Sequence, residues 1–223
     1  MDEVNDRQFQ IRQQRDAALK RNGRVLAKYL WILLWVEIPR LVGMLMTSGL
    51  VNPISFVRLD IGHLLMLGAT IGYGFCLLKL AEVSDRYKYV AWISIALELI
   101  KWVPSFVLDA QRGYMFQYIM LWLTYLMNCG AIYLELQGHM DALYRVDLVL
   151  SEKFYGLSMG FLITYGVQFV CELLYGDISL LRTIAGVGMW LVPIVLLVMN
   201  VLKLIYLYKM AKLFRESVAQ LKI

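Results

Sequence analysis

The chain has 223 residues, a mass of 25.8 kDa and a formal net charge of +5 at neutral pH. Apolar residues make up 60% and charged residues 17% of the sequence, against roughly 45–50% and roughly 25% in ordinary soluble domains. This composition excludes a disordered chain, a collagen, a coiled coil and a small disulfide scaffold, and it is typical of an integral membrane protein.

Long uncharged stretches predict membrane-spanning helices, which need roughly 20 mostly apolar residues each. Acidic and basic residues are absent from 61–78, 113–134, 154–171 and 183–202. Two further apolar stretches each carry an acid and a base near the centre, Glu37 with Arg40 and Glu98 with Lys101. We therefore predict an all-α, polytopic bundle of six transmembrane helices, with four spans as the alternative. The expected spans are about 27–47, 61–80, 89–108, 114–135, 155–175 and 184–204.

The distribution of basic residues predicts the orientation of the bundle. With the N-terminus inside, seventeen Lys and Arg residues fall on the inner side, and only Arg58, Arg112 and Arg182 fall in outer loops. Membrane proteins carry such an excess on their cytoplasmic side. We expect a multi-pass protein of the plasma or inner membrane, with both termini cytoplasmic. The positive charge then reflects orientation in the lipid bilayer, and we expect no nucleic-acid partner.

The segments outside the membrane are expected to be largely helical. Residues 1–24 form a polar cytoplasmic tail, 25–208 the bundle and 209–223 a basic cytoplasmic helix end. Three helices are expected to continue inward, through LAEVSDRYK (80–88), ELQGHMDALYRVDLVL (135–150) and YLYKMAKLFRESVAQL (206–221). Leu136, Met140 and Leu143 recur at spacings of four and three, which predicts an amphipathic face. That face suits the membrane surface or a membrane or cytoplasmic partner protein, bound through residues 136–150 and 205–220.

Polar residues in the apolar stretches repeat at helical spacing, so each set lies on one helix face. A charged side chain facing lipid at mid-membrane costs roughly 2.5–3.5 kcal/mol, which means that these faces are expected to meet one another or water. We predict a mixed-charge cavity in the outer half of the bundle that binds a small polar or zwitterionic solute, as in a transporter or a membrane-embedded substrate-binding subunit. The candidate substrate-binding residues are Glu37, Arg40, His63, Glu98, Lys101, Gln117, Gln168 and Glu172.

Two alternatives to a transporter remain open. Polar contacts between membrane helices also serve as packing interactions, and in that case the protein is a non-catalytic scaffold or regulator that acts through its cytoplasmic helix extensions. The third reading is an intramembrane hydrolase, because Gly156–Gly160 matches G-x-S-x-G. Ser158 would then be the nucleophile and His139 the base.

Catalytic and metal-binding signals are otherwise weak. The two histidines, His63 and His139, are expected on opposite sides of the membrane, so they cannot share an ion. Cys76, Cys129 and Cys171 lie in apolar stretches without a C-x-x-C pair, which predicts reduced thiols. We expect a protein that is not an enzyme and has no metal and no cofactor.

Overall fold

The computed structural model describes residues 2–47, 56–107, 114–174 and 179–220, apart from a number of side chains within these ranges. These residues form six helices and, within the described ranges, no strand. The helices are α1 (Asp2–Thr47), α2 (Phe56–Leu80), α3 (Asp85–Val107), α4 (Tyr114–Leu143), α5 (Leu148–Leu174) and α6 (Ser179–Gln220). The predicted all-α class is confirmed for the described chain.

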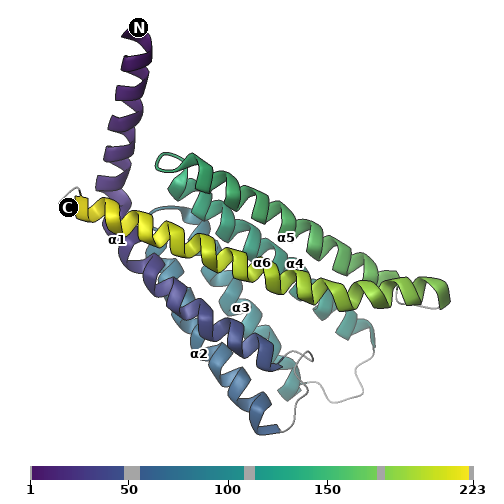
Figure 1. Cartoon of the computed structure of the whole chain (residues 1–223). Helices are drawn as coiled ribbons and strands as arrows, with labels where there is room; N and C mark the ends of the chain where they lie inside the picture. Colours follow the sequence, from purple (N-terminus) through teal and green to yellow (C-terminus); the bar gives the residue numbers. More distant parts are fainter. Residues whose placement is uncertain (1, 48–55, 108–113, 175–178, 221–223) are drawn as a thin grey trace.

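The six helices form a closed ring (Figure 1). Each helix packs along the next one in sequence, and α1 packs on α6 to close the ring. Both chain ends and the turns at 81–84 and 144–147 lie at one end of the bundle, which we call the terminal end. The N-terminal part of α1 projects beyond this end (Figure 1). A ring of this kind places one face of every helix toward a common centre.

The turns at the terminal end correct two of the expected helix extensions. α2 stops at Leu80 and α3 begins at Asp85, so the predicted extension through 80–88 is interrupted by a turn at 81–84. An acidic residue in the first turn favours a helix start, and Asp85 supplies it. α4 stops at Leu143, and the Asp147 side chain accepts a hydrogen bond from the Leu150 backbone N–H at 3.0 Å, which caps α5. The extension of α6 to Gln220 is as predicted.

The most deeply buried apolar side chains lie toward the terminal end. Leu136 and Leu143, from the predicted amphipathic face, are fully buried inside the protein, where they pack with Tyr87, Phe154 and Phe214. The N-terminal part of α1 takes part in the same core, because Leu19 and Leu26 are buried within it. α1 runs without a break across residues 24 and 25, and α6 across 208 and 209, so the core extends into the two terminal segments.

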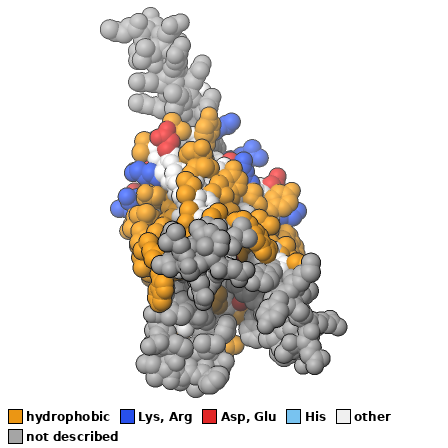
Figure 2. Space-filling model, turned by 90° about the vertical axis from the view of Figure 1, so that its right-hand side faces the viewer, with side chains coloured by type: hydrophobic (Ala, Val, Ile, Leu, Met, Phe, Trp, Pro, Cys, Tyr) orange, Lys and Arg blue, Asp and Glu red, His pale blue; other side chains and the backbone are white. Residues whose placement is uncertain are grey.

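Large hydrophobic side chains are exposed on all six helices. One example from each helix, in the order α1 to α6, is Trp35, Leu64, Trp92, Leu126, Ile163 and Trp190. Figure 2 shows one face on which charged side chains gather near the terminal end and hydrophobic side chains cover the surface beyond them. By length and hydropathy, two segments of the described chain suffice to cross a membrane, Leu148–Glu172 and Gly186–Gln220.

Close packing between α3 and α4 makes one glycine sensitive to substitution. A Cβ atom at Gly138 would lie 2.9 Å from Cε1 of the buried Tyr87 ring, whereas a Cβ at Gly130 on the same helix would meet nothing within 4 Å. We expect Gly138→Ala to lower the free energy of unfolding by about 1–3 kcal/mol. Gly130→Ala is expected to be neutral or to stabilise by up to about 1 kcal/mol, because alanine favours the helix. Thermal unfolding of both variants checks this, and equal melting temperatures would contradict it.

Candidate functional site

A buried ion-pair cluster joins α1, α4 and α6 at the centre of the ring. The Lys203 ammonium donates hydrogen bonds to Glu37 Oε1 at 2.8 Å and to Glu135 Oε2 at 2.7 Å. All three side chains are at most 6% exposed. A buried charge is tolerated only when it is paired and hydrogen-bonded, and one cation here pairs with two carboxylates from helices far apart in sequence.

Arg40 and Tyr73 extend this cluster. Arg40 Nη1 lies 3.4 Å from Glu37 Oε1, so the i, i+3 pair expected from the sequence is present. The Arg40 guanidinium also lies over the Tyr73 ring, 4.4 Å from its centroid, and Lys203 Nζ is 5.7 Å from the same centroid. The quadrupole of an aromatic ring attracts cations that lie over it. The Tyr73 ring of α2 therefore helps to compensate the charges of Arg40 and Lys203.

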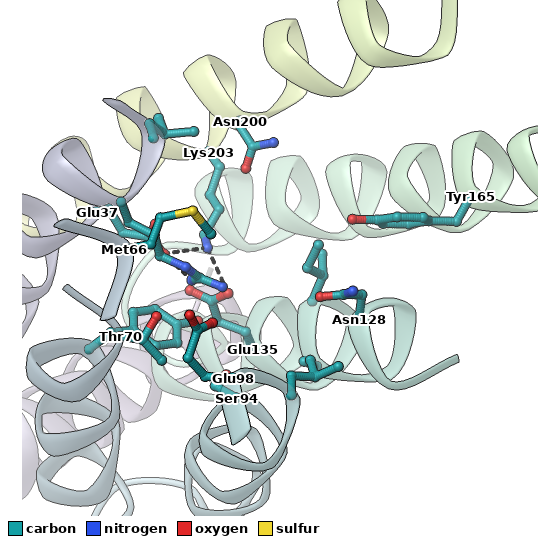
Figure 3. Close-up of a pocket in the computed structure, with 16 residues that line it drawn as sticks. Glu37, Met66, Thr70, Ser94, Glu98, Asn128, Glu135, Tyr165, Asn200 and Lys203 are labelled. Carbon is teal, nitrogen blue, oxygen red and sulfur yellow. Dashed lines mark hydrogen bonds and ion pairs between the residues drawn. The ribbon is translucent and has the colours of Figure 1, made fainter. Parts of the chain in front are cut away.

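A polar cavity of about 230 Å³ lies beside the cluster (Figure 3). All six helices contribute lining residues. Figure 3 shows Glu98 pointing toward the Lys203–Glu135 pair, with Asn128 on α4 and Asn200 on α6. The described lining carries three carboxylates and two cations, which gives it a formal charge of −1. The polar lining residues are Glu37, Arg40, Thr70, Tyr73, Ser94, Glu98, Asn128, Glu135, Tyr165, Asn200 and Lys203.

The candidate residues from the sequence divide into three groups. Three of them, Glu37, Arg40 and Glu98, line this cavity together. Gln168 and Glu172 are not among its lining residues, and instead both hydrogen-bond to Tyr125 of α4, with Gln168 Nε2 3.5 Å from Glu172 Oε1. The side chains of His63, Lys101 and Gln117 lie outside the described residues.

Sequence reasoning missed the residues at the centre of the cluster. The sequence predicts that an inward helix extension begins at Glu135, and Lys203 is one of the seventeen basic residues predicted on the inner side. The available signal was the pattern itself: Asn128 and Glu135 are seven residues apart on α4, and Asn200 and Lys203 three apart on α6. Each pair shares a helix face, and in the structure both faces line the cavity.

A second buried polar group lies next to Glu135, toward the terminal end. His139 Nδ1 is 2.8 Å from the Tyr87 hydroxyl, and His139 Nε2 is 3.7 Å from Glu135 Oε1. Tyr87 precedes the expected span 89–108. Burial raises the pKa of Tyr87 well above its usual value, and the Glu135 and Asp141 carboxylates raise it further. The phenol is therefore neutral at physiological pH and can donate a hydrogen bond to His139 Nδ1.

The two residues suggested for a hydrolase, Ser158 and His139, are not joined by the hydrogen bond that such a pair needs. The buried Ser158 Oγ and His139 Nε2 each lack a hydrogen-bond partner among the described residues, so the serine–histidine hydrogen bond of a nucleophile–base pair is not formed. Asp141 instead bonds to Ser84 and to Arg86 on the α3 side. Within the described ranges, no group of three or more His, Cys, Asp or Glu side chains is placed to hold a metal ion.

The bundle thus combines a polar, charged cavity at its centre with large hydrophobic side chains that are exposed on all six helices. Comparisons of the chain with protein-family models, with curated proteins and with solved structures found no match.

Proposed function

We propose that the chain is a six-span protein of the plasma or inner membrane that binds a small polar or zwitterionic solute in its central cavity. It acts as a transporter or as the membrane-embedded binding subunit of one. The observation that carries this proposal is the polar cavity lined by all six helices. Binding sites are concave and carry a few convergent polar groups, and this one offers carboxylates, cations, amides and a phenol within one space.

The polarity of the bundle supports a membrane location. Exposed hydrophobic side chains occur along all six helices, while Glu37, Glu135 and Lys203 are buried at the centre. An exterior of this kind is favourable in contact with lipid and unfavourable in contact with water. The excess of basic residues on the side of the termini supports the proposed orientation. Ionisable groups inside a membrane bundle commonly mark a solute or ion pathway.

The experiment is native mass spectrometry of the protein extracted gently from its own membrane. Asn128→Leu places an apolar side chain in the cavity without removing a charge, so we expect the folded variant to lose a small molecule that the unaltered protein retains. Asn22→Leu makes the same change outside the cavity and is expected to keep it. Equal retention by the two variants, or the absence of any bound molecule in the unaltered protein, would contradict the proposal.

A second candidate is a scaffold that binds a partner protein at the terminal end. Tyr144, Leu148 and Val149 are exposed there, within the 136–150 segment. Tyr144 also lines, with Arg21 and Arg145, a groove of about 510 Å³ between the 144–147 turn, α1 and α6. In the same mass spectrum, a retained protein subunit without a small molecule would favour this candidate.

A further inference from the structure

Glu135 connects the central cavity to the buried histidine next to it. Its Oε2 atom accepts a hydrogen bond from Lys203 Nζ at 2.7 Å, and both residues line the cavity (Figure 3). Its Oε1 atom lies 3.7 Å from Nε2 of His139, which is one helical turn further along α4 and is not among the residues that line the cavity. One oxygen of this carboxylate therefore holds an ammonium, and the other faces an imidazole.

The two facing atoms, Glu135 Oε1 and His139 Nε2, are buried and lack a hydrogen-bond partner among the described residues. Both side chains are at most 1% exposed. Buried polar atoms without a partner are rare and costly in folded proteins. Their separation of 3.7 Å is only slightly longer than the roughly 2.7–3.2 Å of an N–H···O hydrogen bond. A small approach, driven by a stronger attraction than a neutral ring supplies, would give each atom a partner.

Uptake of one proton by the imidazole supplies that attraction. Whichever ring nitrogen carries the hydrogen of the neutral ring, the imidazolium has an N–H at both. Nδ1–H then donates to the Tyr87 oxygen, 2.8 Å away, while the hydroxyl hydrogen of Tyr87 turns away from the ring. Nε2–H faces Glu135 Oε1 and can form a charge-assisted hydrogen bond with it. The proton stays on the ring, and no covalent bond of the protein breaks.

Several charged and titratable groups face this pair. Tyr87 of α3 bonds to His139, and the Phe154 ring of α5 packs on the imidazole with 5.0 Å between ring centroids. Lys203 is the cation bonded to Glu135, so it is the one with which an imidazolium would compete. The charged and titratable groups near the pair in the described parts of the helices are Glu37 and Arg40 on α1, Tyr73 on α2, Tyr87 and Glu98 on α3, Asp141 on α4 and Lys203 on α6.

We propose that the Glu135–His139 pair binds a proton, and that this proton is coupled to the binding of a carboxylate-bearing solute at Lys203. Once an imidazolium shares the Glu135 carboxylate, that carboxylate holds Lys203 less tightly, because two cations compete for one anion and repel each other. The Lys203 ammonium lines the cavity and can then donate to the carboxylate of a zwitterionic solute. By linkage, the proton and the solute each raise the affinity for the other.

The inference rests on the proposed function, because it uses the same cavity, and it names the coupling ion and the acidic group of the substrate. The test observes the imidazole directly, by NMR of isotope-labelled histidine in lipid nanodiscs between about pH 5 and pH 8.5. His139→Gln identifies the His139 signals beside those of His63. We expect His139 to take up one proton within this range.

Two variants test whether the pair holds this proton. At a fixed pH, Glu135→Gln should lower the ratio of imidazolium to neutral ring about tenfold or more, because the cation loses its carboxylate. Glu152→Gln, the same change at an exposed site on α5, should leave the ratio unchanged. Tyr87→Phe removes the oxygen that accepts from Nδ1–H without changing a charge, and it should lower the ratio about tenfold. This second variant carries the test if Glu135→Gln does not fold.

Acetate is the probe for the carboxylate of the solute. Replacing chloride by acetate at constant ionic strength should raise the ratio of imidazolium to neutral ring about threefold or more, because a bound carboxylate favours the proton. Asn128→Leu, which places an apolar side chain in the cavity, should abolish this response. Ethylammonium chloride, which offers an amine and no carboxylate, should not raise the ratio.

Two results would overturn the inference. If His139 stays neutral over the whole range, or if Glu135→Gln and Tyr87→Phe leave its ratio unchanged, the pair does not bind a proton and a buried water is the better partner for the two atoms. If His139 takes up a proton but acetate has no effect, the proton is not coupled to the cavity. In both cases the native mass spectrum decides the proposed function separately.

Discussion

Lys203→Met is expected to lower the free energy of unfolding by about 3–5 kcal/mol. The ammonium of Lys203 bonds to Glu37 and Glu135, and its removal leaves two carboxylates buried without this cation. Removing one partner of a buried ion pair costs about this much, because the remaining charge is uncompensated. Denaturant or thermal unfolding of the purified protein measures the effect.

The control for this prediction is Lys209→Met, the same change at an exposed site six residues along α6, which should shift stability by no more than about 0.5 kcal/mol. Adding Glu37→Gln and Glu135→Gln to Lys203→Met removes the unpaired charges and should recover part of the loss. If Lys203→Met proves no less stable than Lys209→Met, the ion-pair cluster is not a determinant of the fold.

The second prediction with a large effect concerns cysteine reactivity. A cysteine in the central cavity should react faster than a cysteine on the exposed exterior, although exposed thiols usually react faster than buried ones. In a background with Cys76, Cys129 and Cys171 replaced by alanine, we expect Asn128→Cys to react with a small charged thiol reagent in nanodiscs. Leu126→Cys should react far more slowly, although Leu126 is 70% exposed in the isolated bundle. In the proposed membrane location, lipid covers the exterior and excludes a charged reagent, whereas a cavity of about 230 Å³ has room for several waters at roughly 30 Å³ each.

Glu152→Cys, exposed at the terminal end of α5, gives the reference rate for a water-exposed thiol. A Leu126→Cys rate that matches the Glu152→Cys rate would mean that water reaches the exterior of the bundle, and the membrane proposal would fall. An unreactive Asn128→Cys would mean a closed polar network at the centre and would favour the scaffold candidate.

The two predictions separate packing from binding. The Lys203 cluster is expected to govern stability, whereas Asn128 lines the same cavity without a charge and is expected to govern solute retention. A variant series that loses the solute at Asn128→Leu while keeping its melting temperature would assign the cavity to function. A series in which solute and stability are always lost together would assign it to packing.

The sequence alone determined the secondary structure and much of its placement. Long uncharged stretches predicted six membrane-spanning helices because helical segments in lipid must be apolar. The described residues form six helices, of which two contain segments long and apolar enough to cross a membrane. The i, i+3 spacing of Glu37 and Arg40 predicted their contact, since residues three apart lie on one helix face. Local rules of this kind depend only on near neighbours in the chain.

Tertiary structure alone decided which helix faces meet. Lys203 bonds to Glu37 across 166 positions and to Glu135 across 68, and no periodicity within a single helix encodes such a partner. Helical spacing defines the direction of a polar stripe but not the helix that it faces. The closed ring brings the stripes of α1, α4 and α6 to a common centre, and the unfavourable desolvation of each charge is then offset by the other charges gathered there.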